Sequence, residues 1–83
     1  MLYAIFTNPE AGYDGDGECA IRKGLKVGEK YLVTYVGMGQ SYTGIGLEGI
    51  EGSFNSILFK FKDENGVPVN IYRDPKYNPY MSF

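Results

Sequence analysis

The chain has 83 residues, a formal net charge of −2 and one cysteine, and it contains neither histidine nor tryptophan. This length is enough for one domain only, and a single cysteine excludes an internal disulfide and a zinc site built from thiolates. The small negative charge argues against a strongly basic nucleic-acid-binding protein, and the lack of histidine removes the commonest general base and metal ligand.

The apolar content of the chain gives no sign of a membrane protein. No stretch approaches the ~20 apolar residues that a membrane-spanning helix needs. The first six residues are apolar but lack the basic region of a signal peptide. We therefore expect a cytoplasmic protein with no membrane partner and no cofactor, and a free Cys19 fits a reducing compartment.

Glycine spacing decides between helix and strand in the N-terminal half. Within residues 12–52 the longest run without glycine is eight residues, 29–36. Each interior glycine costs a helix about 1 kcal/mol relative to alanine, so this region predicts strands and no long helix. Before it, residues 2–7 predict a first strand, and residues 8–19 predict a long loop that carries four acidic side chains.

Two strands are expected in the middle of the chain. Residues 30–36 are β-branched and aromatic, which fits a pleated surface. Both faces of this segment are fairly apolar, so it predicts a central strand packed on both sides. Residues 41–47 predict the next strand, with a bulge, a bend or the close approach of another backbone at Gly44 and Gly46.

The clearest alternation lies in residues 57–62. Ile57, Phe59 and Phe61 alternate with a leucine and two lysines, which predicts one buried and one exposed face. Asn65-Gly66 then favours a tight hairpin turn. We expect the return strand at 67–72 and an extended arm after it.

A five-stranded all-β domain follows from these elements. Part of the chain resembles the small SH3-like β-barrel proteins of bacteria and their phages. The resemblance covers about 25–62 and rests on Leu25-Lys26-Val27-Gly28-Glu29-Lys30-Tyr31-Leu32-Val33 and on Gly52-Ser53-Phe54-Asn55-Ser56-Ile57-Leu58-Phe59. It implies a five-stranded SH3-like barrel, here with a long N-terminal loop and an extended C-terminal arm.

Several motifs that carry chemistry in other proteins fail on their context here. Residues 44–49 match the Gly-x-Gly-x-x-Gly fingerprint but no helix follows, so we expect a glycine-rich strand and turn. Residues 14–18 begin like a calcium loop, but the sixth and twelfth positions are wrong, so we expect a solvated acidic loop. Cys19 has no histidine to activate it, and we expect it to be buried. We expect the basic run formed by Arg22, Lys23, Lys26 and Lys30 to be solvated.

The tyrosines point to a binding function. Eight tyrosines exceed what a small core holds, and tyrosine suits interfaces because its ring buries area while its hydroxyl tolerates water. We therefore expect a non-enzymatic protein-binding module, and the resemblance extends this to a phage-encoded inhibitor of a host protein, such as a defence complex. The expected partner-binding residues lie in the acidic loop and the tail. They are Tyr13, Asp14, Asp16, Tyr77, Tyr80 and Phe83.

A second hypothesis is a barrel that binds a small ligand, a nucleotide or a single-stranded nucleic acid. Its site would be the glycine-rich turn, where backbone amides bind an anion and a tyrosine stacks on a base. The residues of this alternative site are Gly37, Gly39, Gln40, Ser41 and Tyr42. The overall negative charge argues against nucleic acid as the partner.

Overall fold

The computed structural model describes residues 1–12, 15–39 and 43–78. Five antiparallel strands form one sheet in the order β4-β3-β2-β1-β5, which confirms the predicted all-β class. The elements are β1 (Leu2–Phe6), α1 (Asp16–Arg22), β2 (Lys30–Met38), β3 (Thr43–Leu47), β4 (Ile50–Asn55), η1 (Ser56–Leu58) and β5 (Phe59–Asp63). Here η1 is a single turn of 3-10 helix.

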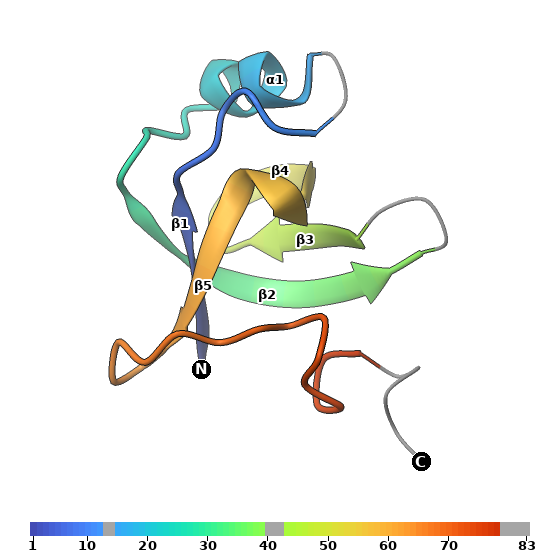
Figure 1. Ribbon diagram of the computed structural model, residues 1–83. Helices are drawn as coiled ribbons and strands as arrows, with labels where there is room; N and C mark the ends of the chain where they lie inside the picture. Colours follow the sequence, from blue (N-terminus) through green and yellow to red (C-terminus); the bar gives the residue numbers. More distant parts are fainter. Residues whose placement is uncertain (13–14, 40–42, 79–83) are drawn as a thin grey trace.

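Strand β2 belongs to both halves of the sheet. Its first residues pair with β1 and its later residues pair with β3, and the register with β3 shifts between Val33 and Tyr35. Such a bulge bends a strand, and in Figure 1 β2 and β3 run across the direction of β1 and β5. The two halves of the sheet therefore enclose one core. In the described residues β4 and β5 do not pair, so they remain the two edges of an open sheet.

Four phenylalanines form the centre of this core, and the alternation in the sequence predicts the burial of two of them, Phe59 and Phe61. Phe6, Phe54, Phe59 and Phe61 are all buried. The rings of Phe6 and Phe59 have centroids 5.5 Å apart, and Phe59 also contacts the other two rings at 6.4 Å. Aromatic pairs at these distances contribute about 0.5–1.5 kcal/mol beyond the area that they bury.

The predicted N-terminal loop is partly wrong, because residues 16–22 form α1. The segment after Gly17 consists of helix-compatible residues, and acidic side chains in the first turn and Arg22 in the last turn suit the helix dipole. Gly17 lies inside this helix. Glycine is needed at this position because a Cβ atom there would lie 1.6 Å from the carbonyl oxygen of Pro9. The glycine that argued against a helix is thus required where α1 packs on the preceding chain.

The prediction that β2 is packed on both sides is also wrong. It is the central strand of the sheet, but none of its residues is fully buried. The reason is that only one face of the β5-β1-β2 half looks into the core. The other face of β2 is open.

Strand β4 was not predicted, since Gly49 and Gly52 made its sequence look like a turn. The alternation of residues 57–62 also begins later than expected. Ile57 lies in η1 and is 50% exposed, whereas Leu58 is fully buried. A 3-10 turn does not place side chains alternately, so the predicted inside face holds only from Phe59 onward.

The C-terminal region differs most from the prediction. The return strand at 67–72 is reduced to one bridge between Lys62 and Pro68, flanked by the hydrogen bonds from Asp63 to Val67 and from Val69 to Phe61, and the chain then turns away from β5. The described part of the arm is not extended. Residues 70–78 form turns (Figure 1). Ile71 is fully buried in the core and Tyr77 packs against the core.

Candidate functional site

The outer face of the β5-β1-β2 half is the open surface of the sheet. In β1, Leu2, Ala4 and Phe6 point into the core, so Tyr3 and Ile5 point outward. Residues opposite each other in antiparallel strands share a face. The register therefore adds residues of β2 and β5, and we define the cationic face as Tyr3, Ile5, Lys30, Leu32, Lys60 and Lys62.

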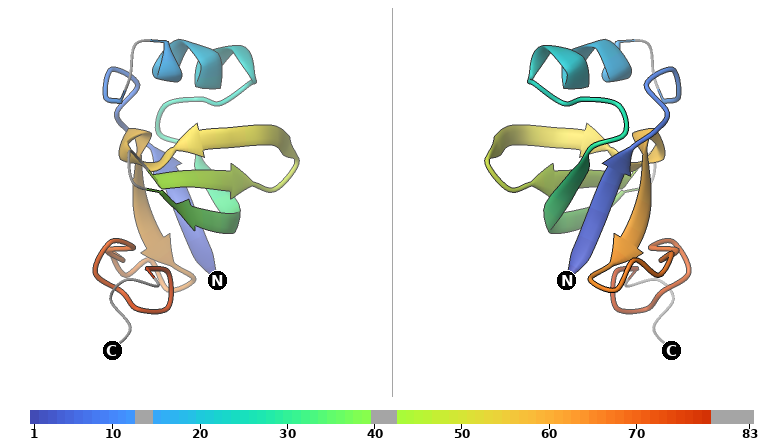
Figure 2. Two further views of the ribbon diagram at one scale, coloured as in Figure 1. Left: turned by 90° about the vertical axis from the view of Figure 1, so that its right-hand side faces the viewer. Right: turned by 90° about the vertical axis from the view of Figure 1, so that its left-hand side faces the viewer.

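The lysines of the cationic face surround its apolar residues. Ile5 lies opposite both Lys60 and Lys30, and Tyr3 lies opposite Lys62 and Leu32. In the right-hand view of Figure 2, β2, β1 and β5 lie side by side in front, and the segment after β5 lies at the lower end of β5. The face thus combines three cations and three half-buried apolar side chains on one continuous surface.

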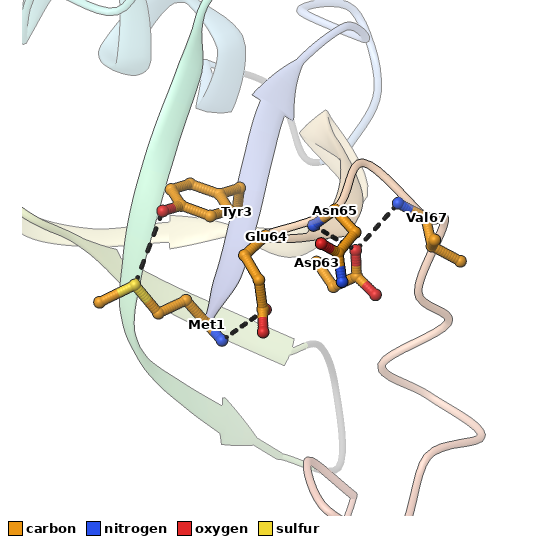
Figure 3. Close-up of polar contacts among 6 residues, drawn as sticks. All are labelled: Met1, Tyr3, Asp63, Glu64, Asn65 and Val67. Atoms are coloured by element: carbon orange, nitrogen blue, oxygen red, sulfur yellow. Dashed lines mark hydrogen bonds and ion pairs between the residues drawn. The ribbon is translucent and has the colours of Figure 1, made fainter.

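Tyr3 is held in place by its neighbours. The ammonium nitrogen of Lys30 lies 4.9 Å from the centroid of the Tyr3 ring, and the Tyr3 hydroxyl donates to the sulfur of Met1 at 3.6 Å. Beside it, the N-terminal ammonium group contacts Glu64 Oε2 at 2.8 Å, as Figure 3 shows. The hydrogen bond from this ammonium group holds the pKa of Glu64 below its ordinary value of 4.5. Glu64 is therefore already paired at the border of the cationic face.

Lysines on an edge strand often serve only to prevent sheets from joining edge to edge. This explanation applies to Lys60 and Lys62, because β5 is an edge. At Lys30, too, β2 has a neighbouring strand on one side only, because its pairing with β3 begins at Val33. A use of the face is therefore indicated by its half-buried apolar residues and not by the lysines alone.

The basic run 22–30 does not act as one unit. Lys23 donates to the carbonyl oxygen of Glu51 at 3.1 Å and lies over the Phe54 ring, so it ties α1 to β4. Lys30 starts β2 and joins the cationic face. Lys23 and Lys30, which are close in the sequence, therefore lie in two different parts of the molecule.

Of the expected partner-binding residues the structure describes two, Asp16 and Tyr77, and it places them apart. Asp16 begins α1, where its carboxylate accepts from the Asn55 amide at 3.1 Å. Tyr77 lies in the segment after β5, which is at the opposite end of the molecule from α1 in Figures 1 and 2. Tyr13, Asp14, Tyr80 and Phe83 lie outside the described residues, so their role stays a prediction.

The alternative ligand site is described only in part. Gly37 and Gly39 line a shallow hollow with Tyr35, whose side chain is 51% exposed. The Tyr35 ring lies against Gly46, where a Cβ atom would be 2.2 Å from the ring. Gln40, Ser41 and Tyr42 lie outside the described residues, and anion binding by this turn stays a prediction.

The remaining chemical motifs are accounted for by the fold. Residues 44–49 form β3 and a turn, as expected, but Cys19 is exposed on α1 and not buried. Among the described residues, no three acidic or cysteine side chains gather into a metal site. None of the helices described is long and apolar enough to cross a membrane.

The sequence predicts that some residues of the cationic face are exposed, but it does not predict that they lie on one surface. The alternation that exposes Lys60 and Lys62 was visible in the sequence. Which strands lie beside β5 was not, because pairing depends on contacts between residues up to about 60 positions apart, such as Leu2 and Asp63. Tyr3 and Ile5 therefore gave no separate signal.

Comparison with known proteins places the chain in a phage family. No curated protein and no solved structure matched the chain. The family model described as bacteriophage T4 protein Y07B matches residues 1–83, which is the full sequence. The chain therefore belongs to the bacteriophage T4 protein Y07B family.

Proposed function

We propose that this phage protein is a non-enzymatic protein-binding module that binds and inhibits a host protein in the cytoplasm. Membership of a phage family supports the phage setting of this proposal. We propose further that the fold is an SH3-like barrel. The short 3-10 connection between the edge strands β4 and β5, and the bent strand shared by both halves, support this reading.

The observation that carries the proposal is the uncovered cationic face. Its apolar members, Tyr3, Ile5 and Leu32, are half-buried, and no described helix packs over them. A protein interface typically has an apolar centre with an aromatic residue and a polar rim. The cationic face has this composition, with lysines at its margin.

Tyr77 argues for the sheet face over the tail as the docking surface. It packs against the core, so its ring is already used within the domain. The lack of histidine in the sequence supports binding over acid–base catalysis.

The test has two parts: a host protein is captured, and the residues through which it binds are then identified. The tagged protein is incubated with host lysate, the captured protein is purified, and its affinity is measured for the wild type and for Ile5→Asp. We expect Ile5→Asp to weaken binding about tenfold or more, because it places a carboxylate in the apolar centre of the interface. Chemical cross-links from Lys30, Lys60 and Lys62 to the partner would map the contact.

Ile21→Asp is the matched control, because Ile21 is 52% exposed on α1, away from the cationic face. It should bind like the wild type. Equal binding by all three proteins would contradict the use of this face. Recovery of no specific protein would contradict the function itself.

The exposed Tyr35 beside the hollow at Gly37 and Gly39 favours one alternative, a nucleotide or single-stranded nucleic-acid site. Thermal unfolding in the presence of nucleotides and short oligonucleotides tests it. A melting temperature that no such ligand raises would eliminate this alternative.

A further inference from the structure

We infer that the cationic face takes an acidic, extended segment of its partner protein, with carboxylates at alternate positions. This inference rests on the proposed function, because it names the chemistry of the partner at the proposed surface. It is carried by charge complementarity and by the spacing of the lysines.

The three lysines of the face are free to pair with an incoming acid. In the described part of the chain, none of Lys30, Lys60 and Lys62 forms an ion pair with a carboxylate. The nearest acids along β5 have other partners. Asp63 Oδ1 accepts from the amides of Asn65 and Val67 at 2.8 and 2.9 Å, and Glu64 pairs with the N-terminus (Figure 3).

The spacing of the cations matches an extended chain. Lys60 and Lys62 are two residues apart on one strand, which places their Cα atoms about 6.6 Å apart. Alternate side chains of an extended partner segment have the same spacing, so two successive outward carboxylates reach both lysines. Lys30 lies two strands away from Lys60, roughly 10 Å away on the other side of Ile5. It would contact the opposite side of the partner's acidic segment.

An acidic protein segment fits this face better than a nucleic acid does. Single-stranded nucleic acid needs open aromatic rings on which its bases stack. The one aromatic residue of the cationic face, Tyr3, already has the Lys30 ammonium group near its ring and uses its hydroxyl on Met1. The face carries no arginine, whose planar guanidinium group suits bidentate contacts with phosphate.

The experiment is a titration of the isotopically labelled protein followed by NMR. The probe is a blocked decapeptide with glutamate at alternate positions and valine, serine and tyrosine between them. At low ionic strength we expect the amide shifts to concentrate on β1, β5 and the first residues of β2. Raising the salt to about 0.5 M should weaken binding severalfold, because exposed charges are then screened.

Two comparisons isolate the charges. The double variant Lys60→Glu/Lys62→Glu should weaken peptide binding about tenfold, since two attractions become repulsions. Arg22→Glu/Lys26→Glu changes the net charge equally but away from the face, and it should bind within about twofold of the wild type. The same peptide with glutamine in place of glutamate should bind weakly or not at all.

Each other outcome overturns the inference. These outcomes are shifts that fall elsewhere, equal losses in both double variants, absence of peptide binding, or tighter binding of a thymidine decanucleotide on the same face. Failure of the proposed function is distinguishable. If a host partner binds through Ile5 but tolerates Lys60→Glu/Lys62→Glu, the function stands and only the acidic chemistry fails.

Discussion

The two faces of the β5-β1-β2 half are made from the same strands but have different roles. On the inner face, phenylalanines contact one another and are almost fully buried. On the outer face, lysines surround half-buried apolar residues, and no described helix covers them. The difference shows that alternation along a strand separates the residues that stabilise this small domain from those available to a partner.

The strongest test of this separation uses two neighbours on β5. Phe59→Ala should lower the free energy of unfolding by about 3–5 kcal/mol, because it removes the ring that contacts three others. Lys60→Ala should change it by less than about 0.5 kcal/mol. Urea denaturation measures both values, and similar losses would break the distinction between the faces.

The second test asks whether the C-terminal segment belongs to the inner face. Ile71 is fully buried, so Ile71→Ala should cost about 2–4 kcal/mol. Val67 is 54% exposed in the same region, and Val67→Ala should cost less than about 1 kcal/mol. Thermal or urea unfolding of the two variants measures these losses. A small loss of unfolding free energy in Ile71→Ala would mean that the segment is only loosely attached.

A smaller effect is expected from the hydrogen bond that fixes this segment to η1. The hydroxyl oxygens of Ser56 and Tyr72 are 2.6 Å apart. Tyr72→Phe removes this bond and leaves the Ser56 side chain buried, so we expect a loss of about 0.5–1.5 kcal/mol. Ser56→Ala with Tyr72→Phe removes both partners and should cost little more than Tyr72→Phe alone. A clearly larger loss in the double variant would show that Ser56 stabilises the domain by another contact.

The smallest expected effect concerns the border of the outer face. The pKa of Glu64 is lower in the folded protein than its ordinary value of 4.5, so the ion pair stabilises the fold fully above that pH. The contribution is lost as the pH falls through the lower pKa of the folded state. Because both partners are exposed, Glu64→Gln should lower the urea midpoint only slightly at pH 7.

Below the folded-state pKa of Glu64, wild type and Glu64→Gln should unfold at the same urea concentration. High salt at pH 7 should also reduce the difference between them, since the pair is screened. A difference that is unchanged at low pH would show that Glu64 acts through packing and not through its charge.

The local features of β5 were predictable, whereas its surroundings were not. The alternation of Phe59 and Phe61 with Lys60 and Lys62 depends only on the pleat of a strand, and the structure confirms it. The return strand expected at 67–72 is wrong beyond residue 69, because the chain runs alongside β5 only at 67–69 and then turns so that Ile71 is buried in the core. Tertiary burial there overrides a local turn signal.

The same contrast holds for glycine. At Gly46 the sequence indicated a bulge, a bend or the approach of another backbone, and the structure has a register shift there and a side chain, the Tyr35 ring, against the glycine. At Gly17 the glycine suggested a loop, but it allows α1 to pack on the carbonyl oxygen of Pro9. A glycine in a sequence marks a lack of side chain, and only the packing shows which neighbour uses that space.

The sequence alone determined the all-β class and the burial of Phe59 and Phe61, because these follow from glycine spacing and alternation. The tertiary structure decided the register of β1 with β2 and β5, and with it the position of Tyr3 and Ile5 among three lysines. It also decided that Tyr77 packs on the core. Pairing between distant strands depends on how the whole chain buries its apolar surface, which no short stretch of sequence specifies.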